Sequence, residues 1–520
     1  MGLAVGIDLG TSNSVVAYYQ NGEPRILADA KGNTVHPSVV AFGYGESTVV
    51  GHRARQQLTY APENTIASVK RLMGRRFDSV EVERMRAMVA WGIAEGPNLD
   101  ARVRIQGKVY AVPEVSAHVL RHMKQIAEEA LGEVVDKAVI TVPAYFNDQQ
   151  RQATRDAATI AGLECLRIIN EPTAAALAYG YRKGKRQHVA VYDLGGGTFD
   201  ISLLRIDDDF FEVVSTAGDT FLGGDDFDTA LSEHLLATLQ QTTGVELSTR
   251  HVALTKIREA AEKAKRELSS AASAEIRVPN LARDESGQPI HLITTLDRSM
   301  LSRLVMPLIQ RTFLVVDDAL KQARLTATQI DEVLLVGGMT RLPLIREAVG
   351  HYFRRKAQDN INPDEVVALG AAIQAHTLTD TAGIADAVLL DVTPQSLGVR
   401  TVGGFVEQII PRNTPIPTQA GKVFHTATDN QDQVRIQVFQ GESRMAEDND
   451  FLGDFVLDNL RPAPRGEIAI RITFSIDTDG IVAVRARDEE TGQETDMLLE
   501  ASSNLSRDEV QRLRFDELGF

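Results

Sequence analysis

Two copies of one short phrase hold the residues that could do chemistry: DLGTSN at residues 8–13 and DLGGGTFD at residues 193–200. Each copy lies between two apolar runs, which predicts a β-hairpin closed by a glycine-rich turn. Such turns let backbone N–H groups approach an anion, the hydroxyl groups add donors, and each Asp offers a carboxylate to a hydrated divalent cation. Two such hairpins predict a nucleoside triphosphate bound between two similar lobes. The alternative is a chance repeat of a common tripeptide, which the hydroxyl residues in both copies disfavour.

A larger α/β body must position these hairpins. Residues 138–143 predict a buried strand that leads to a helix entry at Asn147, and residues 333–338 predict a strand that ends in a glycine turn. Helices are predicted from Glu171, with Pro in the first turn, and over residues 366–373. This alternation of strand, turn and helix over about 380 residues predicts the α/β class.

The pattern changes after residue 380. Apolar residues then alternate with polar ones at every second position, as in 434–438 and 468–476. This period, with hairpin turns at 403–404 and 479–480, predicts an all-β unit of about 110 residues, most simply a sandwich. A capping-box pattern at residues 506–509 predicts a short helix near the end of the sequence.

The predicted helix over residues 251–271 presents two different stripes. Leu254, Ile257, Ala261, Ala264 and Leu268 form an apolar stripe. The separate polar stripe consists of Glu262, Lys265, Arg266 and Ser269. Spacing alone favours a solvated face with weak ion pairs over a face that contacts an adenosine.

Composition narrows the class of protein. The chain has 520 residues, enough for three or more structural units, and its formal net charge of −16 disfavours a general nucleic-acid binder. No signal-peptide pattern and no apolar run of about 18 residues is present, so we expect no membrane insertion. The single cysteine, Cys165, excludes an internal disulfide and favours a reducing, cytoplasmic compartment. Neither a zinc pattern nor a G-x-x-x-x-G-K-[ST] loop occurs.

The order of these elements resembles the Hsp70 chaperone family, in its DnaK-like form, from residue 6 to about residue 513. The motifs that carry the resemblance are IDLGTSNS, VKRLMGRRF, ITVPAYFNDQQRQATRDAA, IINEPTAAALAYG, YDLGGGTFDIS, GDTFLGGDDFD, EKAKRELSS, LVGGMTRLP, NPDEVVALGAA, LLDVTPQSLG, FQGE and PAPRG. The resemblance implies an actin-like, two-lobed ATPase domain over 1–383 and an interdomain linker over 384–391. It also implies a β-sandwich that binds peptides over 392–502 and a short remnant of a helical lid over 503–520.

The resemblance also implies a nucleotide site with ATP or ADP, Mg²⁺, and K⁺ as a further candidate. Asp8 and Asp193 would hold the metal, mostly through water. The implied catalytic residues are Lys70, Glu171, Thr198 and Asp200. The implied phosphate-loop residues are Gly10, Thr11, Ser12, Asn13, Gly195, Gly196, Gly197 and Thr198. The implied adenosine contacts are Glu262, Lys265, Arg266, Ser269, Gly337, Gly338, Arg341 and Asp364, which overturns the spacing-based preference for a solvated face.

The implied activity is that of a chaperone that hydrolyses ATP slowly and binds extended hydrophobic segments of unfolded proteins. The implied partners are client polypeptides, a J-domain co-chaperone and a nucleotide exchange factor, with neither nucleic acid nor membrane. The implied peptide groove consists of Leu397, Val399, Thr401, Val402, Phe424, Ala427, Val434, Ile436 and Ile470, which core packing alone would also explain. The implied allosteric residues are Pro143, Arg151, Arg167, Asn170 and Asp391.

Two other functions stay open. Relatives continue into a longer helical bundle, so the short final helix predicts fast peptide exchange in both nucleotide states. It also keeps open a lidless scaffold with a fixed partner, in which ATP is a structural ligand. A sugar or acetate kinase on the actin-like fold is the third reading, and it leaves residues 392–500 unexplained.

Overall fold

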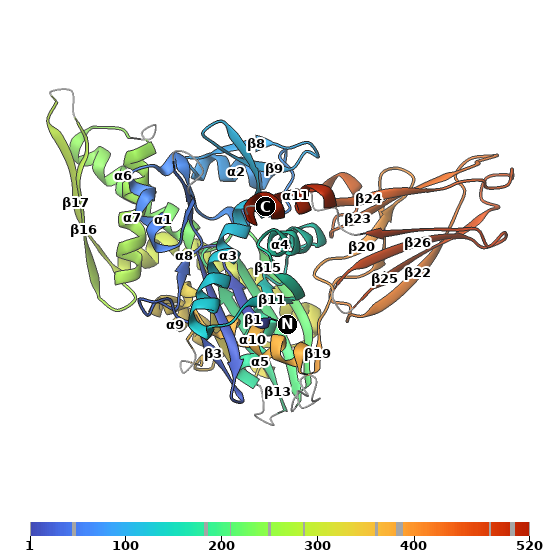
Figure 1. Ribbon diagram of the computed structural model, residues 1–520, viewed down its shortest axis with the longest axis horizontal. Coiled ribbons are helices and arrows are strands. Elements are labelled where there is room, and N and C mark those ends of the chain that lie inside the picture. The colour runs from blue at the N-terminus through green and yellow to red at the C-terminus, as the bar shows by residue number, and fades with distance from the viewer. Residues whose placement is uncertain are drawn as a thin grey trace.

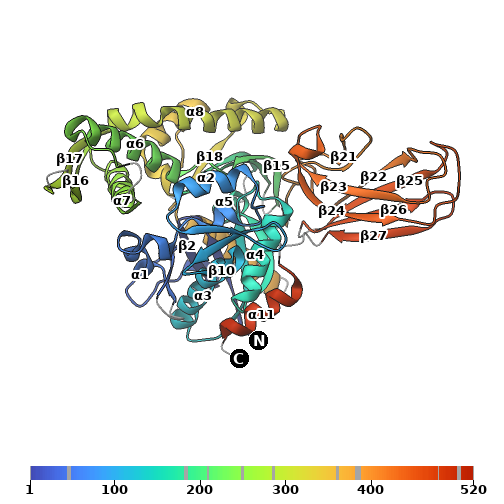
Figure 2. The same cartoon turned by 90° about the horizontal axis from the view of Figure 1, so that it is seen from above.

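The computed structural model describes residues 2–43, 48–180, 186–207, 210–247, 251–283, 287–358, 362–380, 388–477, 480–499 and 505–518. A large α/β body carries an elongated β-sandwich on one side (Figure 1; Figure 2). The α/β body contains two lobes, each built on a mixed sheet. The predicted class, an actin-like α/β domain followed by an all-β sandwich, is confirmed.

Lobe I is built on a sheet of strand order β12-β11-β1-β2-β3, with β4 paired to β2. β1 runs parallel to β11 and antiparallel to β2, so the first predicted hairpin is present, with Leu9 opposite Ser14. The strands are β1 (Leu3–Leu9), β2 (Asn13–Gln20), β3 (Glu23–Ile26), β4 (His36–Pro37), β11 (Val135–Val142) and β12 (Glu164–Asn170).

Lobe II is built on a sheet of strand order β18-β13-β14-β15-β19. β13 and β14 form the second predicted hairpin, with Leu194 opposite Phe199. The strands are β13 (Arg186–Leu194), β14 (Phe199–Asp207), β15 (Phe210–Asp219), β18 (Glu332–Val336) and β19 (Val388–Leu390).

Two helices rich in small residues pack between the sheets of the two lobes. α5 (Glu171–Gly180) and α10 (Val366–Thr379) contact each other, and together they contact strands of both sheets. Gly370 makes this packing close, because a Cβ there would lie 1.8 Å from the backbone oxygen of Ala174. On its other side the sheet of lobe I is covered by α3 (Val112–Leu131) and α4 (Asp148–Ile160).

Further elements complete each lobe. Those of lobe I are α1 (His52–Arg55), α2 (Val80–Met88), β5 (Val40–Phe42), β6 (Thr48–Val50), β7 (Thr65–Ile66), β8 (Gly92–Glu95), β9 (Ala101–Ile105) and β10 (Lys108–Ala111), with the 3-10 helix η3 (Val69–Leu72). Those of lobe II are α6 (Gly224–Thr243), α7 (His251–Glu267), β16 (Ser273–Arg283), β17 (Pro289–Asp297), α8 (Arg298–Ala323) and α9 (Pro343–Phe353). The predicted helix at 251–271 therefore ends four residues early, and Ser269 lies in the turn that follows.

By length and composition, α8 is the one helix among the described residues that could cross a membrane. Its position explains this composition differently, because one face of α8 is buried in the core of lobe II through Leu301, Val305, Ile309 and Val316. Polar residues such as Arg303 and Asp317 are exposed on the other side. These features are those of an amphipathic helix that packs one face on the core of lobe II.

The sandwich has two four-stranded antiparallel sheets, β21-β20-β23-β24 and β22-β25-β26-β27. The predicted alternation is present: Ile470, Ile472, Phe474 and Ile476 are buried between the sheets. The strands are β20 (Leu397–Arg400), β21 (Val406–Ile410), β22 (Thr418–His425), β23 (Val434–Gln440), β24 (Asp450–Leu457), β25 (Ala469–Ile476), β26 (Val482–Asp488) and β27 (Glu494–Leu499). In the predicted turn at 403–404, Gly403 and Gly404 both have a positive φ, as expected. In the other predicted turn, at 479–480, Asp479 lies outside the described residues.

Two elements connect the sandwich to the α/β body: the linker segment before the sandwich and the helix after it. The predicted linker at 384–391 lies partly outside the described residues, and its described part forms β19, which pairs in parallel with β15. After β27 the chain returns to lobe I, where α11 (Arg507–Leu518) packs on α4 (Figure 2). Leu505 and Val510 are buried there, and Glu509 pairs with Arg102 at 2.9 Å.

Candidate functional site

The two glycine turns face each other across the cleft between the lobes. A Cβ on Gly196 would lie 1.8 Å from Ser12 Oγ, and one on Gly197 would lie 2.6 Å from Thr11 Cγ2. Only glycine permits this approach of the second turn to the hydroxyl groups of the first. The structure thus brings together the two copies of the repeated phrase, with backbone and hydroxyl groups of both turned toward one place.

Lys70 is the cation at the floor of this cleft. It lies in η3, its side chain is buried, and its Nζ donates to Glu171 Oε1 at 2.7 Å and to the backbone oxygen of Leu9 at 2.5 Å. Glu171 is the first residue of α5, so the pair joins an upper element of lobe I to the helix between the sheets. A buried lysine held by one carboxylate and one carbonyl is positioned rather than mobile.

Three further carboxylates share this site, and their pKa values are raised. Burial, with the charge of Glu171 second, raises the pKa of Asp8 to about 7 and that of Asp200 to about 8. The pKa of Asp193 is raised well above its usual value by the same two causes. Four carboxylates therefore face the single ammonium of Lys70, and the site lacks positive charge.

Besides Glu171, which Lys70 holds, two of these carboxylates accept hydrogen bonds within the described part of the chain. Thr141 Oγ1 donates to Asp8 Oδ1 at 2.8 Å, and the backbone N–H of Tyr145 donates to Asp200 Oδ1 at 3.2 Å. Among the described residues, no group of three or more His, Cys, Asp or Glu side chains is arranged to ligate a metal directly. The deficit of positive charge fits a hydrated divalent cation, since Mg²⁺ keeps several of its waters when it binds to proteins.

The polar stripe of α7 faces the same cleft. Lys265 is buried, its Nζ pairs with Asp228 at 2.7 Å, and it donates to the backbone oxygen of Gly224 at 3.1 Å. Arg266 is exposed and pairs with Glu262 at 2.8 Å. A solvated face does not explain the buried Lys265, so the spacing-based preference was wrong at this position.

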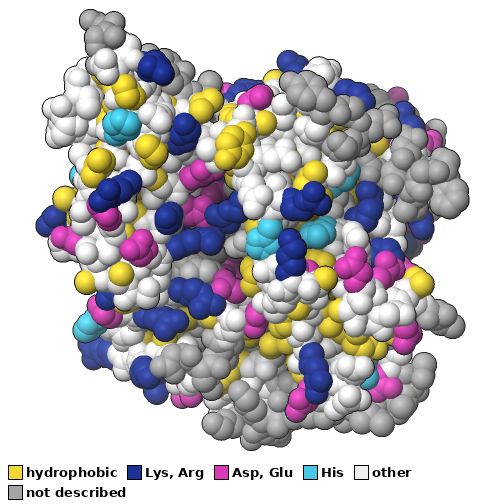
Figure 3. Space-filling view, turned by 60° about the vertical axis from the view of Figure 1, so that its left-hand side comes forward, with side chains coloured by type: hydrophobic (Ala, Val, Ile, Leu, Met, Phe, Trp, Pro, Cys, Tyr) yellow, Lys and Arg dark blue, Asp and Glu magenta, His cyan; other side chains and the backbone are white. Residues whose placement is uncertain are grey.

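The residues opposite α7 approach it closely. A Cβ on Gly224 would lie 3.0 Å from Met339 Sδ and 3.2 Å from Lys265 Nζ, so this glycine lies between α7 and the turn after β18. In that turn Arg341 pairs with Asp364 at 2.6 Å, and Gly337 has a φ of 81°. Figure 3 shows a hollow of the surface in which Lys, Arg, Asp and Glu side chains gather.

Contacts between the upper parts of the lobes close the cleft, and sequence reasoning missed them. Arg55 of α1 donates to Glu262 of α7 at 2.6 Å, and Thr59 donates to Glu259 at 2.7 Å. Burial alone would raise the pKa of Glu262, but the nearby charges of Arg55 and Arg266 lower it. The partners Arg55 and Glu262 lie 207 positions apart, so no local pattern in the sequence could have paired them.

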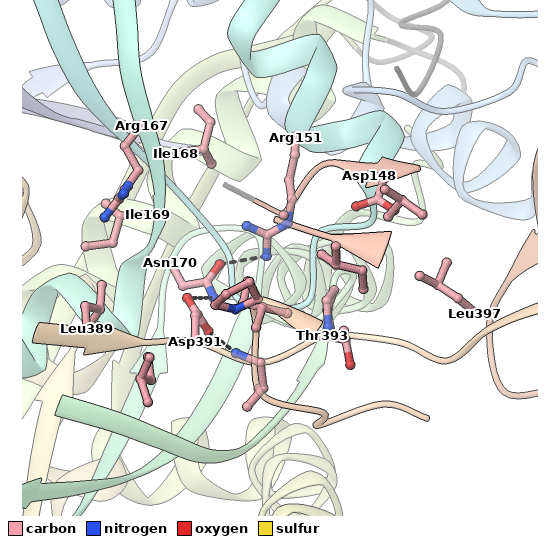
Figure 4. A pocket seen from close by; sticks show the side chains of 18 of the residues that line it. Asp148, Arg151, Arg167, Ile168, Ile169, Asn170, Leu389, Asp391, Thr393 and Leu397 are labelled. Atoms are coloured by element: carbon pink, nitrogen blue, oxygen red, sulfur yellow. Dashed lines mark hydrogen bonds between the residues drawn. The ribbon is translucent and has the colours of Figure 1, made fainter. Parts of the chain in front are cut away.

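A second cluster lies where β19 meets the end of β12. Asn170 Nδ2 donates to Asp391 Oδ2 at 2.7 Å, and Arg151 Nη2 donates to Asn170 Oδ1 at 2.7 Å (Figure 4). Burial raises the pKa of Asp391 and lowers that of Arg151. These residues line a cavity of about 100 Å³ together with Arg167. Four of the five expected allosteric residues are thus brought together.

Pro143, the fifth expected allosteric residue, lies between Lys70 and the second cluster. We call this second cluster, which contains Arg151, Asn170 and Asp391, the linker cluster. Its carbonyl accepts from the N–H of Phe146, and the Phe146 carbonyl accepts from Arg151 Nε at 3.0 Å. The ring of Phe146 also lies 5.5 Å below Lys70 Nζ. The segment from 143 to 146 therefore contacts both the lysine of the cleft and the arginine of the linker cluster.

The sandwich is held against the α/β body by polar contacts that the sequence did not predict. Asn147 donates to Asp450 at 2.7 Å at the start of α4, and Gln149 donates to the backbone oxygen of Phe451 at 3.1 Å. The backbone N–H of Asp148 donates to Gln440 at 3.2 Å.

A separate contact lies on lobe II, where Arg412 pairs with Asp318 at 3.0 Å. These contacts place the β21-β20-β23-β24 sheet beside the cluster of Arg151, Asn170 and Asp391.

The expected peptide-groove residues fall into two groups. Leu397, Val399, Ile436 and Ile470 are buried in the sandwich core, and Phe424 and Val434 pack partly against it. The surface members are Thr401, Val402 and Ala427, of which Val402 is 78% exposed. The side chains of the first group support the strands, and those of the second lie in loops at the end of the sandwich.

A comparison with protein-family models matches this chain over residues 4–518 to the family described as "Hsp70 protein". The match includes both lobes, the linker strand β19, the sandwich and α11.

Proposed function

The chain belongs to the Hsp70 family, and we propose that it binds extended hydrophobic segments of unfolded polypeptides, with ATP binding and slow hydrolysis controlling its affinity for them. Members of this family are ATP-dependent chaperones that work with client polypeptides and co-chaperones. The observation that carries the proposal is the pair of opposed glycine turns above Lys70, Glu171 and Asp200. We place the protein in the cytoplasm, which its single cysteine supports.

The cleft fits a hydrolysis that depends on positioning. Phosphoryl transfer passes through a loose transition state, so neutralising charge and aligning the attacking water account for most of the catalysis. Lys70 would neutralise charge on the terminal phosphate, and Glu171, Thr198 and Asp200 would orient the water. A bound Mg²⁺ would supply the missing positive charge, and Asp8 and Asp193 would hold it, mostly through water. K⁺ is a further candidate for the same carboxylates.

The two lobes would share the nucleotide. The turns at 10–13 and 195–198 would take the phosphates through backbone N–H and hydroxyl groups. The adenosine would lie between α7, with Lys265 buried near the C-terminal end of the helix, and the turn that carries Gly338 and Arg341. The contact of Arg55 with Glu262 at 2.6 Å would keep the lobes together over the bound nucleotide.

The sandwich would hold the client. An extended peptide gains affinity from backbone hydrogen bonds and selectivity from an apolar pocket. The exposed Val402 and the half-buried Val434 are the best placed of the expected groove residues to contact it. The linker cluster of Arg151, Asn170 and Asp391 would transmit the state of the cleft, and a J-domain protein would act on the same cluster.

The deciding experiment measures ATP turnover of the full chain with and without an extended apolar peptide, in the presence of a J-domain protein. We expect the apolar peptide to raise turnover several-fold and a charged peptide of equal length to leave it unchanged. Turnover that no peptide changes, with MgADP still bound in calorimetry, would favour a scaffold with a fixed partner. Stimulation by glucose or acetate would favour a kinase.

A further inference from the structure

Three histidines from different elements of lobe I pack around one another. His36 of β4 is central: its ring centroid lies 5.7 Å from that of His52 at the start of α1 and 5.6 Å from that of His122 on α3. Both contacts are edge to face, with interplanar angles of 67° and 90°. We call these three side chains the histidine cluster. It lies outside the nucleotide residues described above.

His36 is 1% exposed, and within the described part of the chain neither of its ring nitrogens makes a hydrogen bond of good geometry. Burial, reinforced by the charges of His122 and His52, lowers the pKa of His36 to about 4. Asp29 and the backbone of Asn33, in the segment before β4, act in the opposite direction. His36 is therefore packed as a neutral ring.

The other members have different surroundings. His52 is exposed, and its Nε2 lies 3.1 Å from the backbone oxygen of Val35. Burial lowers the pKa of His122, whereas the carboxylates of Asp29 and Glu129 oppose this.

The cluster touches the nucleotide cleft on two sides. On the first side, His36 pairs with Ser14 across β4 and β2. Two residues further on, Ser38 donates to the backbone oxygen of Gly10 at 2.8 Å. The backbone N–H of Ser38 also donates to the oxygen of Ser12. A displacement of β4 would therefore reach the first phosphate turn.

On the second side, the cluster supports α1. His52 is the first residue of this four-residue helix and Arg55 is the last. Gly51 precedes it, with a φ of 75°, and a Cβ there would lie 3.1 Å from His122 Nε2. Arg55 reaches across the cleft to Glu262. The packing of the three rings thus supports the helix that joins the lobes.

We propose that protonation of the histidine cluster speeds the release of nucleotide, and we call the cluster an acid-released latch. In its neutral form the cluster holds α1 and β4 in place. Protonation frees both elements, so that the contact of Arg55 with Glu262 weakens and nucleotide leaves faster. Two protonated rings would be like charges less than 6 Å apart in a partly buried place, which disfavours the packed arrangement. This inference rests on the proposed nucleotide site.

The direction of the effect follows from His36. Its pKa is lowered in the packed cluster, so the packed form binds protons less readily than the released form. The stabilisation is present above the ordinary pKa of 6.5 and is lost as the pH falls from there toward about 4. Release is therefore expected to begin below pH 6.5 and to increase as the pH falls toward about 4.

The test measures the dissociation rate of a fluorescent ADP from the full chain, with Mg²⁺, at pH 7.5 and pH 5.5. We expect the rate of the unaltered protein to rise about tenfold more than that of His36→Thr, which keeps a β-branched strand residue without a titrating ring. His351→Gln, at an exposed histidine of α9, should keep the full pH response. Equal pH responses of the unaltered protein and His36→Thr would overturn the latch.

Two further measurements keep the inference separate from other causes. In an Arg55→Gln background, which already lacks the contact with Glu262, His36→Thr should change the pH response less than twofold. NMR titration of the histidine C–H signals without nucleotide should show one ring that stays neutral to below pH 5.5, and three rings that titrate near 6.5 would contradict the latch. Absence of ADP binding at pH 7.5 would instead refute the proposed function.

If His36→Thr does not fold, His122→Gln provides the same comparison, because it removes one of the two rings that face His36. We expect it to reduce the pH response of the dissociation rate at least threefold. An unchanged response in this variant would also count against the latch.

Discussion

Asn170 and Glu171 are consecutive residues that hold two different clusters. Asn170, the last residue of β12, donates to Asp391 of the linker segment at 2.7 Å, and Glu171, the first residue of α5, accepts from Lys70 at 2.7 Å. A change of backbone at this junction moves both side chains together. The residues that hold the linker segment and the lysine of the cleft are therefore joined by one peptide bond.

We expect Asn170→Ala to loosen the linker strand. The substitution removes the donor to Asp391 and the acceptor for Arg151, so two buried charged groups lose a partner. Amide hydrogen exchange of Leu389 and Leu390 should speed up by roughly tenfold, which corresponds to about 1.4 kcal/mol. Asn459→Ala, at an exposed asparagine of the sandwich, is the control. Unchanged exchange in β19 would mean that pairing with β15 alone holds the strand.

Thr198→Ala should slow hydrolysis while it leaves nucleotide binding intact. Thr198 is buried in the second turn, and its carbonyl accepts from the N–H of Gly195, so the backbone of the turn does not depend on its side chain. Loss of one group that positions the water is expected to lower the single-turnover rate by roughly 100-fold. A rate within twofold of that of the unaltered protein would remove Thr198 from the catalytic residues.

The stability of the unliganded protein should fall as the pH rises from 6 to 8. Burial, with the charge of Glu171 second, raises the pKa of Asp200 from 3.8 to about 8. The folded state therefore holds a proton that the unfolded state releases, and this contribution is present below pH 3.8 and lost as the pH rises through about 8. The free energy of unfolding should drop by about 2 kcal/mol over this interval.

This pH effect can be measured by urea unfolding without Mg²⁺ or nucleotide. Asp200→Asn removes the titrating group at nearly constant shape, so its unfolding free energy should change less between pH 6 and pH 8. Added MgADP should restore most of the stability of the unaltered protein at pH 8, because it adds positive charge to the four carboxylates. An equal decline in Asp200→Asn would assign the effect to other groups.

Val434→Phe should weaken the binding of model peptides without unfolding the sandwich. Val434 is half-buried on β23 and packs against the edge of the core, so a larger ring fills the neighbouring space at a cost of about 1–3 kcal/mol. Fluorescence anisotropy should show at least a tenfold loss of affinity for an apolar peptide. Val456→Phe, at an exposed valine of the paired strand β24, is the matched control. Equal affinities in both variants would place the groove elsewhere.

Much of the fold could be predicted because its signals are local. The repeated phrase predicted both hairpins, the period of two predicted β23 and β25, and the apolar run before a glycine turn predicted β18. The end of α7 was misjudged because the apolar stripe continues through Leu268 into the turn that follows. The described part of the predicted linker is a strand, since β15 has a free edge that only the three-dimensional sheet reveals.

The site could be predicted less completely than the fold. The turn residues and Lys70 lie in recognisable motifs, and the structure brings them together. The contacts of Arg55 with Glu262 and of Arg412 with Asp318 join segments that are far apart in the sequence, and each charged residue alone looks like an ordinary surface group. The histidine cluster was missed for the same reason, because its three members come from separate elements and share no spacing.

The approach of Gly196 to Ser12 has a consequence for discrimination between ligands. Since Gly196 has no side chain, its backbone and the side chain of Ser12 set how closely the two lobes approach each other here. In the proposed site, ATP and ADP would differ by one phosphoryl group at this place. The separation of the lobes would then depend on the length of the phosphate tail, and a methyl group at position 196 would force the two turns apart whichever nucleotide is bound.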